Sequence, residues 1–172
     1  MRENNKDQLK ILFVCTGNTC RSPMAEGILK KMLKDNEIMS VQVSSAGIYS
    51  LENAPASLFA IQVARLKDVD LSSHRSHQLS QKMVEEADLI LVMSQEHMEY
   101  VKRANPEAQH KTYLLRVFPQ LRPQSNEDQN QGVLFIKDPI GCSLEDYERS
   151  FLEIAKEIKR IFPELLNLMT KR

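Results

Sequence analysis

A cysteine and an arginine near the start of the chain have the spacing of a phosphoryl-transfer site. Cys15 opens the segment CTGNTCRS, and Arg21 closes a Cys-x5-Arg pattern within it. A thiolate is a strong nucleophile, and a guanidinium binds two phosphate oxygens through its planar fork of N–H groups. The pair therefore predicts transfer of a phosphoryl group to the sulfur of Cys15, followed by hydrolysis of the phosphocysteine.

The flanking residues predict how such a loop is held. The apolar run at 11–14 is typical of a buried strand, and Pro23 suits the first position of a helix whose apolar spacing continues to Leu33. A loop between a strand end and a helix N-terminus presents unpaired N–H groups, to which the helix dipole adds positive potential. Gly17 favours a tight curl, and Asn18 tolerates a positive φ. We therefore expect an anion-binding loop.

Beside this positive potential Cys15 should ionise early, with its pKa lowered from about 8.5 into the range of roughly 3.5–7.5. The hydroxyl of Ser22 is suited either to donate to that thiolate or to cap the helix. The expected phosphate-binding loop consists of Thr16, Gly17, Asn18, Thr19, Cys20 and Ser22.

Other interpretations of the loop are weaker. A nucleotide-binding P-loop needs Gly-Lys-Ser/Thr where this segment has Cys-Arg-Ser. Zinc binding is disfavoured because four residues separate Cys15 from Cys20 and no second Cys/His pair has zinc spacing. The alternative that both cysteines are small core side chains stays open.

The rest of the chain predicts an α/β fold. Strands are expected at 10–14, 41–45, 88–93 and 111–115, and helices at 23–33, 56–66, 81–87, 95–104 and from 144 onward. Ser80, Ser94 and Ser143 suit helix caps, and Pro163 should end or kink the last helix. Alternating strands and helices indicate a parallel sheet covered on both faces, with ligands bound at the carboxyl ends of the strands.

Length and composition narrow the class of protein. The 172 residues are 42% hydrophobic and 27% charged with a formal net charge of zero, as in soluble globular proteins. We expect one domain over 1–172, with a flexible tail at 1–9 and an exposed loop at 118–132. The balanced charge favours neither nucleic acid nor an acidic membrane, and no apolar run reaches about 18 residues. With no signal peptide in the polar start, we expect a cytoplasmic protein with reduced thiols and neither metal nor cofactor.

The segment VCTGNTCRSPMAEG resembles the signature of the low molecular weight protein tyrosine phosphatases. SSAG, LSSHRSHQL, ADLILVMS and DPIG follow in the family's order, so the resemblance covers about residues 10–160 and is closest in the first motif. It implies a three-layer α/β fold, in which a four-stranded parallel sheet has helices on both faces and the phosphate-binding loop follows the first strand. It also implies a phosphatase that acts on phosphorylated proteins and releases inorganic phosphate.

The resemblance assigns roles to individual residues. Cys15 would be the nucleophile, Arg21 the phosphate clamp and Asp138 of DPIG the general acid. A carboxylic acid near the loop can protonate a departing oxygen and later accept a proton from water. The family also implies a network that braces the loop, made of Asn18, Ser22, Ser45 and His74.

The second cysteine of the loop has two interpretations. The resemblance favours a resolving role, in which Cys20 captures the sulfenic acid of oxidised Cys15 as a disulfide. The alternative is a half-buried packing thiol. The remaining histidines, His77, His97 and His110, match no motif and are expected on the surface.

The sequence departs from the family's pattern at two places. Ile140 and Gly141 stand where animal members have two adjacent tyrosines, which excludes tyrosine-kinase control at that point. Thr19 stands where members selective for phosphotyrosine often have a bulky aliphatic residue, and bacterial members that act on phosphoarginine resemble CTGNTCRSPMAE. Phosphoarginine is therefore a serious substrate candidate beside phosphotyrosine. Tyr49 and Ile140 are expected to wall the pocket, although Tyr49 equally suits simple packing on the surface.

Two other functions are compatible with a phosphate-binding loop of this kind. A thiol-dependent arsenate reductase uses the same scaffold but needs further cysteines, and Cys142 is the single other thiol in the chain. A non-catalytic phosphate-binding module would have no use for a nucleophile, a clamp and an acid together. We therefore favour a phosphatase over both.

Overall fold

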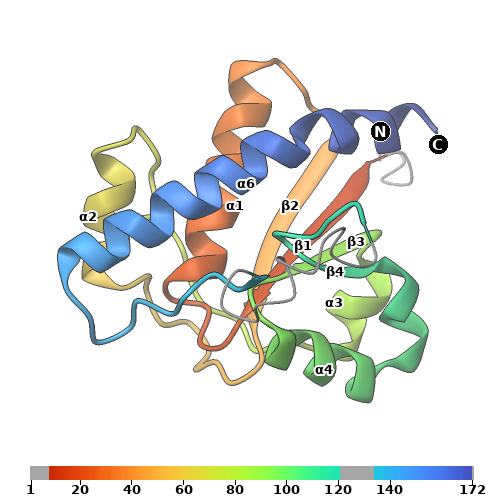
Figure 1. The fold of residues 1–172 in the computed structure, drawn as a ribbon, viewed down its shortest axis with the longest axis horizontal. Helices are drawn as coiled ribbons and strands as arrows, with labels where there is room; N and C mark the ends of the chain where they lie inside the picture. The colour runs from red at the N-terminus through yellow and green to blue at the C-terminus, as the bar shows by residue number, and fades with distance from the viewer. Residues whose placement is uncertain (1–7, 121–133, 172) are drawn as a thin grey trace, which may run out of the picture.

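The computed structural model describes residues 8–120 and 134–171. Within these ranges a four-stranded parallel sheet has the order β2-β1-β3-β4. Its strands are β1 (Leu9–Cys15), β2 (Val41–Gly47), β3 (Leu89–Val92) and β4 (Thr112–Leu114). The helices are α1 (Arg21–Asp35), α2 (Leu58–Arg65), α3 (Gln81–Glu86), α4 (Gln95–Ala104), α6 (Leu144–Thr170) and the 3-10 helix η1 (Pro106–Lys111) (Figure 1).

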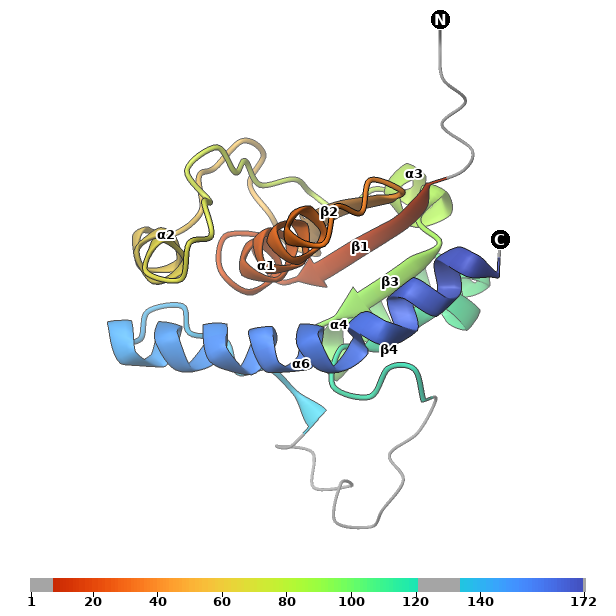
Figure 2. The same cartoon turned by 90° about the horizontal axis from the view of Figure 1, so that it is seen from above.

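A separate set of helices covers each face of the sheet (Figures 1 and 2). Ile11 and Phe13 of β1 belong to one core cluster, which they share with residues of α1, α2 and α6. Leu12 and Val14 belong to a second cluster, with residues of α3 and α4. Because successive side chains of a strand point to opposite faces, a strand buried on both faces is apolar throughout. The predicted three-layer α/β fold is confirmed.

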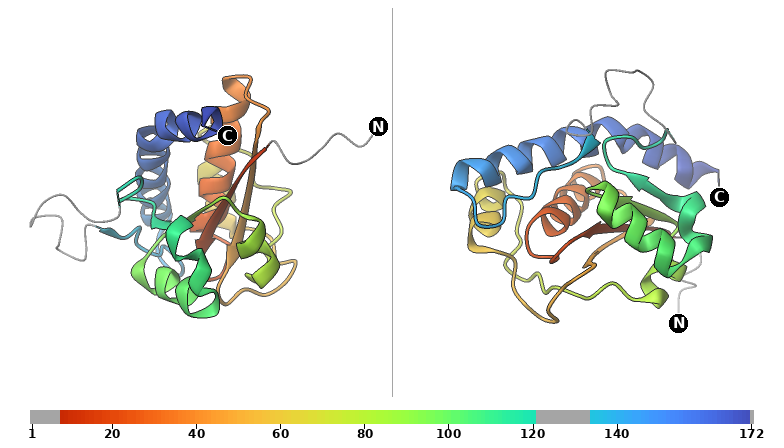
Figure 3. Two further views of the ribbon diagram at one scale, coloured as in Figure 1. Left: turned by 90° about the vertical axis from the view of Figure 1, so that its right-hand side faces the viewer. Right: turned by 60° about the horizontal axis from the view of Figure 1, so that its bottom comes forward.

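The strands end together at one edge of the sheet. Cys15, the last residue of β1, pairs with Gly47 of β2, and Val14 pairs with Val92 of β3. The loop between β1 and α1 starts at this edge, where ligands bind in parallel α/β sheets. Figure 3 (right) shows α6 along one side of the sheet and α4 on the other.

Some element boundaries differ from the sequence prediction. Helix α1 begins at Arg21 rather than Pro23, which lies within the first turn, where a missing N–H costs no helical hydrogen bond. Helix α2 begins at Leu58, after a cap by Ser57. Helix α6 does not end at Pro163, because Leu165 beyond it is buried on the apolar face of the helix.

Two segments expected to be irregular are partly built into the fold. Leu9 is 4% exposed and, as the first residue of β1, pairs with Val41 of β2, so the prediction of a tail over 1–9 is wrong at its end. Residues 1–7 lie outside the described residues. Phe118 is also 4% exposed, and its carbonyl accepts a hydrogen bond from Arg160. The predicted exposed loop at 118–132 is therefore wrong at Phe118, and residues 121–132 lie outside the described residues.

The described helices include none that is both long and apolar enough to cross a bilayer.

Candidate active site

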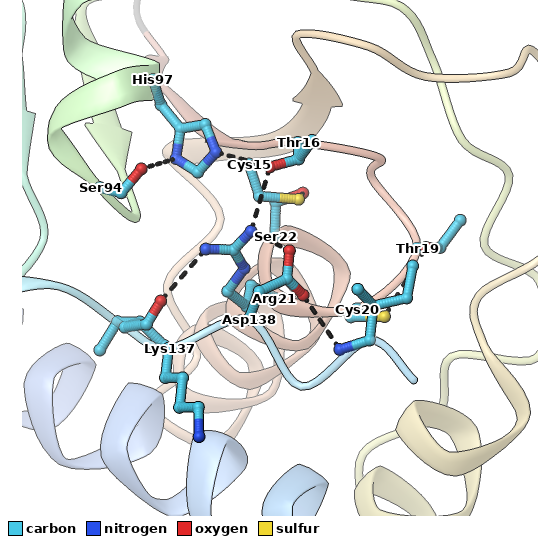
Figure 4. Close-up of polar contacts among 12 residues, drawn as sticks. Cys15, Thr16, Thr19, Cys20, Arg21, Ser22, Ser94, His97, Lys137 and Asp138 are labelled. Carbon is cyan, nitrogen blue, oxygen red and sulfur yellow. Dashed lines mark hydrogen bonds and ion pairs between the residues drawn. The ribbon is translucent and has the colours of Figure 1, made fainter. Parts of the chain in front are cut away.

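The loop between β1 and α1 turns around the sulfur of Cys15 (Figure 4). Asn18 has φ 53°, in the left-handed region that the sequence predicted for it, and its side chain is fully buried. The backbone N–H groups of Asn18 and Ser22 are directed at Cys15. Several backbone donors aimed at one point make a site suited to an anion.

A network of buried polar side chains holds this loop from behind. The amide Nδ2 of Asn18 donates to Ser22 Oγ at 2.9 Å and to Ser45 Oγ at 2.8 Å. The ring of His74 donates from Nε2 to the carbonyl of Asn18 at 2.8 Å, and burial lowers the pKa of His74, which favours the neutral ring. The structure thus brings together the four side chains that the sequence placed in a bracing network. The sequence did not anticipate that Asn18 Oδ1 also accepts from the backbone N–H of His77, at 2.9 Å.

A glycine outside the loop allows the loop to lie against the sheet. A Cβ atom at Gly47 would lie 2.5 Å from the carbonyl oxygen of Thr16 and 2.9 Å from the backbone nitrogen of Asn18. Neither backbone atom can move without moving the loop. At Gly17, by contrast, φ lies outside the left-handed region and a Cβ atom would make only an ordinary 3.7 Å contact with Thr19. The glycine that the loop geometry requires is therefore Gly47, not Gly17.

Cys15 itself is 2% exposed, and its Sγ lies 2.9 Å from Ser22 Oγ. Because Ser22 Oγ accepts a hydrogen bond from Asn18 Nδ2, its own hydroxyl proton is available to Cys15. Ser22 does not cap α1.

Burial raises the pKa of Cys15, while Arg21 and the hydroxyl of Ser22 lower it, and burial prevails. The prediction of a lowered pKa is therefore wrong for this closed arrangement, in which the loop excludes water from the sulfur.

The guanidinium of Arg21 is 4% exposed and held by three partners. Nη1 donates to the carbonyl of Ile136 at 3.1 Å, and Nη2 donates to Thr16 Oγ1 at 3.1 Å. Nη2 also forms an ion pair with Asp138. The Nε–H group is buried without an acceptor among the described residues, so one donor of the guanidinium is left for a ligand oxygen.

The other predicted site residues flank the loop. Asp138 is partly exposed, and its Oδ1 accepts from the N–H of Ile140 at 3.1 Å. The side chain of Ile140 is exposed. Tyr49 donates its N–H to the carbonyl of Thr16, and its exposed ring packs edge-on against Tyr100 at 5.6 Å.

The hydrogen-bond partners of Cys20, the second cysteine of the loop, do not include Cys15. Sγ of Cys20 lies 3.3 Å from Ser57 Oγ and 3.3 Å from the hydroxyl of Tyr147. Burial raises the pKa of Tyr147 to about 12, so this hydroxyl keeps its proton. Cys15 and Cys20 are both buried free thiols.

One histidine that matched no motif belongs to the site. His97 was expected on the surface, but its side chain is fully buried, with Nε2 3.0 Å from Thr16 Oγ1 and Nδ1 3.0 Å from Ser94 Oγ. The Ser94 hydroxyl consequently makes no capping bond to α4, contrary to prediction. The available sequence signal was the position of His97 in the first turn after a strand end, where parallel sheets carry their sites. No cluster of three or more possible metal-ligating side chains occurs in the described ranges.

The fold and the loop together define a class of protein: α/β phosphatases with a cysteine at the bottom of a phosphate-binding loop. The model of the low molecular weight phosphotyrosine protein phosphatase family matches residues 10–171, and the chain belongs to this family.

Its relatives include enzymes named for two substrates. A protein-arginine-phosphatase of Geobacillus stearothermophilus is 35% identical over 156 residues, 91% of this chain and 95% of that protein. The low molecular weight protein-tyrosine-phosphatase Etp of Escherichia coli (strain K12) is 42% identical over 104 residues, 60% of this chain and 67% of that protein. The solved structure of the YwlE arginine phosphatase from Geobacillus stearothermophilus has a TM-score of 0.80 at 32% identity, covering 95% of this chain and 97% of that one.

We expect the burial of His97 to make the protein less stable in acid. Burial and the nearby charge of Arg21 lower the pKa of His97 from 6.5 to about 3. Between these values the unfolded chain binds a proton that the folded chain does not, so this contribution to stability is lost as the pH falls through 6.5 toward 3. His97→Gln should show a smaller fall in unfolding free energy between about pH 7 and about pH 5, measured by urea denaturation. His110→Gln, at an exposed histidine, should keep the wild-type dependence; equal pH dependence in His97→Gln would contradict the prediction.

Proposed function

We propose that the phosphatase works through a phosphocysteine on Cys15 and that phosphoarginine side chains of proteins are its substrate. One observation carries the proposal, the set of donors around the sulfur of Cys15. Backbone N–H groups point at this sulfur, the hydroxyl of Ser22 lies 2.9 Å from it, and the neighbouring guanidinium of Arg21 has a buried Nε–H group without an acceptor among the described residues. This arrangement suits a nucleophile and a phosphate held against each other.

In the first step Asp138 leaves Arg21 and the substrate phosphate takes its place. Phosphate oxygens accept from the loop N–H groups and from Nε and Nη2 of Arg21. The sulfur of Cys15 then attacks phosphorus, and the bond from phosphorus to the leaving oxygen or nitrogen breaks. Asp138, freed from the ion pair, takes up a proton from solvent, to which Cys15 has released its own, and delivers it to the leaving atom.

In the second step water attacks the phosphocysteine. Asp138 takes a proton from the water, the P–S bond breaks, and its electron pair returns to Cys15 as inorganic phosphate forms. The hydroxyl of Ser22 donates to the departing sulfur, because Asn18 already occupies one of its lone pairs and directs its proton forward.

The thiolate forms when the closed arrangement opens. In that arrangement burial keeps the sulfur dry and raises the pKa of Cys15, although Arg21 lowers it, and Arg21 is paired with Asp138. Removing Asp138 from the ion pair leaves the positive charge of Arg21 unopposed beside the sulfur. The movement that frees Arg21 thus favours ionisation of the nucleophile before phosphate binds, and the bound phosphate then neutralises Arg21.

Three observations favour phosphoarginine. Asp138 already binds a guanidinium, that of Arg21, so the carboxylate is placed to hold the guanidinium of a substrate. Thr19 is half-buried in the loop, with Oγ1 3.7 Å from Cys20 Sγ and its carbonyl bound to the N–H of Ser57. A hydroxyl at this position can orient the guanidinium or the attacking water, which an aliphatic side chain cannot do. Relatives over most of the chain are named protein-arginine-phosphatases.

We also propose a cytoplasmic location, where the free thiols are kept reduced. Cys20 would protect Cys15 under oxidative stress. Its thiol is held by Ser57 and Tyr147 and must rotate away from them to reach Cys15.

Replacing Cys15 with serine tests the nucleophile. Cys15→Ser should lose turnover of p-nitrophenyl phosphate but still bind inorganic phosphate, because the loop N–H groups and Arg21 remain. Steady-state assays and calorimetry would measure the two properties. Turnover within about tenfold of wild type would remove Cys15 from this role, and a wild type without turnover would indicate a binding module.

Replacing Asp138 with asparagine tests the acid. Asp138→Asn should slow substrates with basic leaving groups more than those with acidic ones, because proton donation matters most when the leaving atom is basic. Rates for phenyl and p-nitrophenyl phosphate would be compared. Equal slowing of both substrates would make Asp138 a structural residue only.

Replacing Thr19 with isoleucine tests the substrate. Both side chains are β-branched, so the change chiefly removes a hydroxyl and adds a methylene. Thr19→Ile should reduce turnover of a phosphoarginine protein by about 5- to 150-fold, the value of a hydrogen bond of about 1–3 kcal/mol in the transition state, and spare phosphotyrosine turnover. Parallel loss of both activities, or a wild type inactive on phosphoarginine, would return the assignment to a tyrosine phosphatase.

Mild peroxide should inactivate the enzyme reversibly by forming a Cys15–Cys20 disulfide. In this reaction peroxide oxidises the Cys15 thiolate to a sulfenic acid. The thiol of Cys20 then attacks the oxidised sulfur, an S–S bond forms, and the hydroxyl group of the sulfenic acid leaves as water. Peptide mapping of the oxidised protein would identify the bond. A disulfide between Cys15 and Cys142, or none, would reject the resolving role of Cys20.

A further inference from the structure

A line of hydrogen bonds joins α4 to the guanidinium of Arg21. Ser94 Oγ lies 3.0 Å from His97 Nδ1, His97 Nε2 lies 3.0 Å from Thr16 Oγ1, and Thr16 Oγ1 accepts from Arg21 Nη2 at 3.1 Å (Figure 4). The residues come from the end of β3, from α4, from the loop after β1 and from the start of α1. The bracing network around Asn18 does not include them.

The hydrogen bonds of Thr16 indicate which atom donates and which accepts in each pair. Its oxygen accepts from Arg21, so its own proton is best placed on the unprotonated Nε2 of His97. The proton of the ring then lies on Nδ1 and is donated to Ser94 Oγ. Burial and Arg21 lower the pKa of His97 to about 3, so the ring is neutral and able to accept at neutral pH.

These hydrogen bonds hold Nη2 of Arg21, whose guanidinium has to keep one orientation in order to bind phosphate. Nη1 is fixed by the carbonyl of Ile136, and Nη2 is shared by Thr16 and Asp138. In the proposed reaction Asp138 leaves to protonate the substrate, and Nη2 then depends on Thr16 for its protein contact. A threonine hydroxyl free to rotate could instead turn its proton toward the guanidinium, which would repel it.

We propose that His97 is a positioning residue for the phosphatase reaction: by accepting the Thr16 proton, it keeps the Thr16 lone pair on Arg21 and so holds the guanidinium in its phosphate-binding orientation. The inference rests on the proposed function of Arg21 as the phosphate clamp. It explains why a histidine buried to 0% exposure is bonded through both ring nitrogens rather than replaced by an apolar side chain.

The test compares two replacements of the same buried side chain. His97→Leu removes the hydrogen bonds to Thr16 and to Ser94. In His97→Gln the side-chain amide can place its oxygen where Nε2 of the histidine lies, and so can still accept from Thr16. We expect His97→Leu to lose about 10- to 100-fold in kcat/KM for p-nitrophenyl phosphate, as expected for a misplaced clamp, and His97→Gln to recover most of the loss. His110→Leu, at an exposed histidine on η1, is the matched control and should keep wild-type activity.

Vanadate binding separates positioning from mere stability. Calorimetry with vanadate, which resembles the transition state, should show the same fold-loss in His97→Leu as kcat/KM, with inorganic phosphate affected less. The double variant Thr16→Val/His97→Leu should lose no more than Thr16→Val alone, because both act through one line of bonds. Thr16→Val and Thr16→Ser also provide the comparison should His97→Leu fail to fold.

The possible outcomes are distinct. A folded His97→Leu protein with wild-type kcat/KM and vanadate affinity would overturn the inference, as would multiplied losses in the double variant. A wild type that binds vanadate but turns over no phosphate ester would refute the proposed function, and the vanadate measurements would still test His97. Loss in His97→Leu with recovery in His97→Gln would establish the role.

Discussion

The loop depends on one buried amide that uses both of its N–H groups and its carbonyl oxygen in hydrogen bonds. Asn18 donates from Nδ2 to Ser22 and Ser45, and its Oδ1 accepts from the backbone of His77. Its backbone meanwhile adopts φ 53°, which turns the loop N–H groups inward. A carboxylate at this position could not donate to the two serines, and an apolar side chain would remove one hydrogen bond from each of the three partners. The left-handed turn and the orientation of Ser22 toward Cys15 therefore depend on the same side chain.

The ion pair between Arg21 and Asp138 gives the protein a closed form in which, under the proposed mechanism, the acid occupies the place of the substrate. The arrangement satisfies a guanidinium that would otherwise be buried without a counter-ion, at the cost of keeping the sulfur neutral and dry. A phosphate dianion carries more charge than the carboxylate, and it also bonds to Nε and to the loop N–H groups. In the proposed mechanism, release of the acid from Arg21 therefore comes first and favours the thiolate, and the substrate phosphate then binds to the freed guanidinium.

The sequence predicts those features of the structure that depend on residues close to one another along the chain. The strand-loop-helix order around Cys15, the positive φ of Asn18 and the parallel sheet follow from apolar spacing and turn chemistry, and the structure agrees with them. It does not predict contacts made between distant segments. His97 is one histidine without a motif, and its contact with Thr16 joins residues 81 positions apart. The pKa of Cys15 was given the wrong direction because it depends on burial, which a local motif does not report. Helix α6 continues through Pro163 because tertiary packing of Leu165 outweighs the local preference.

The close approach of Gly47 to the loop has a consequence for protein engineering. The phosphate-binding segment reads as a portable unit, since strand, loop and helix are contiguous in the chain. Its backbone nevertheless lies so near the neighbouring strand that a single methyl group at Gly47 would overlap the carbonyl of Thr16. A designer who transplants residues 9–35 into another parallel sheet must therefore transplant an empty space as well: the host strand beside β1 has to carry glycine at the level of Cys15, or the grafted loop will not close around its sulfur.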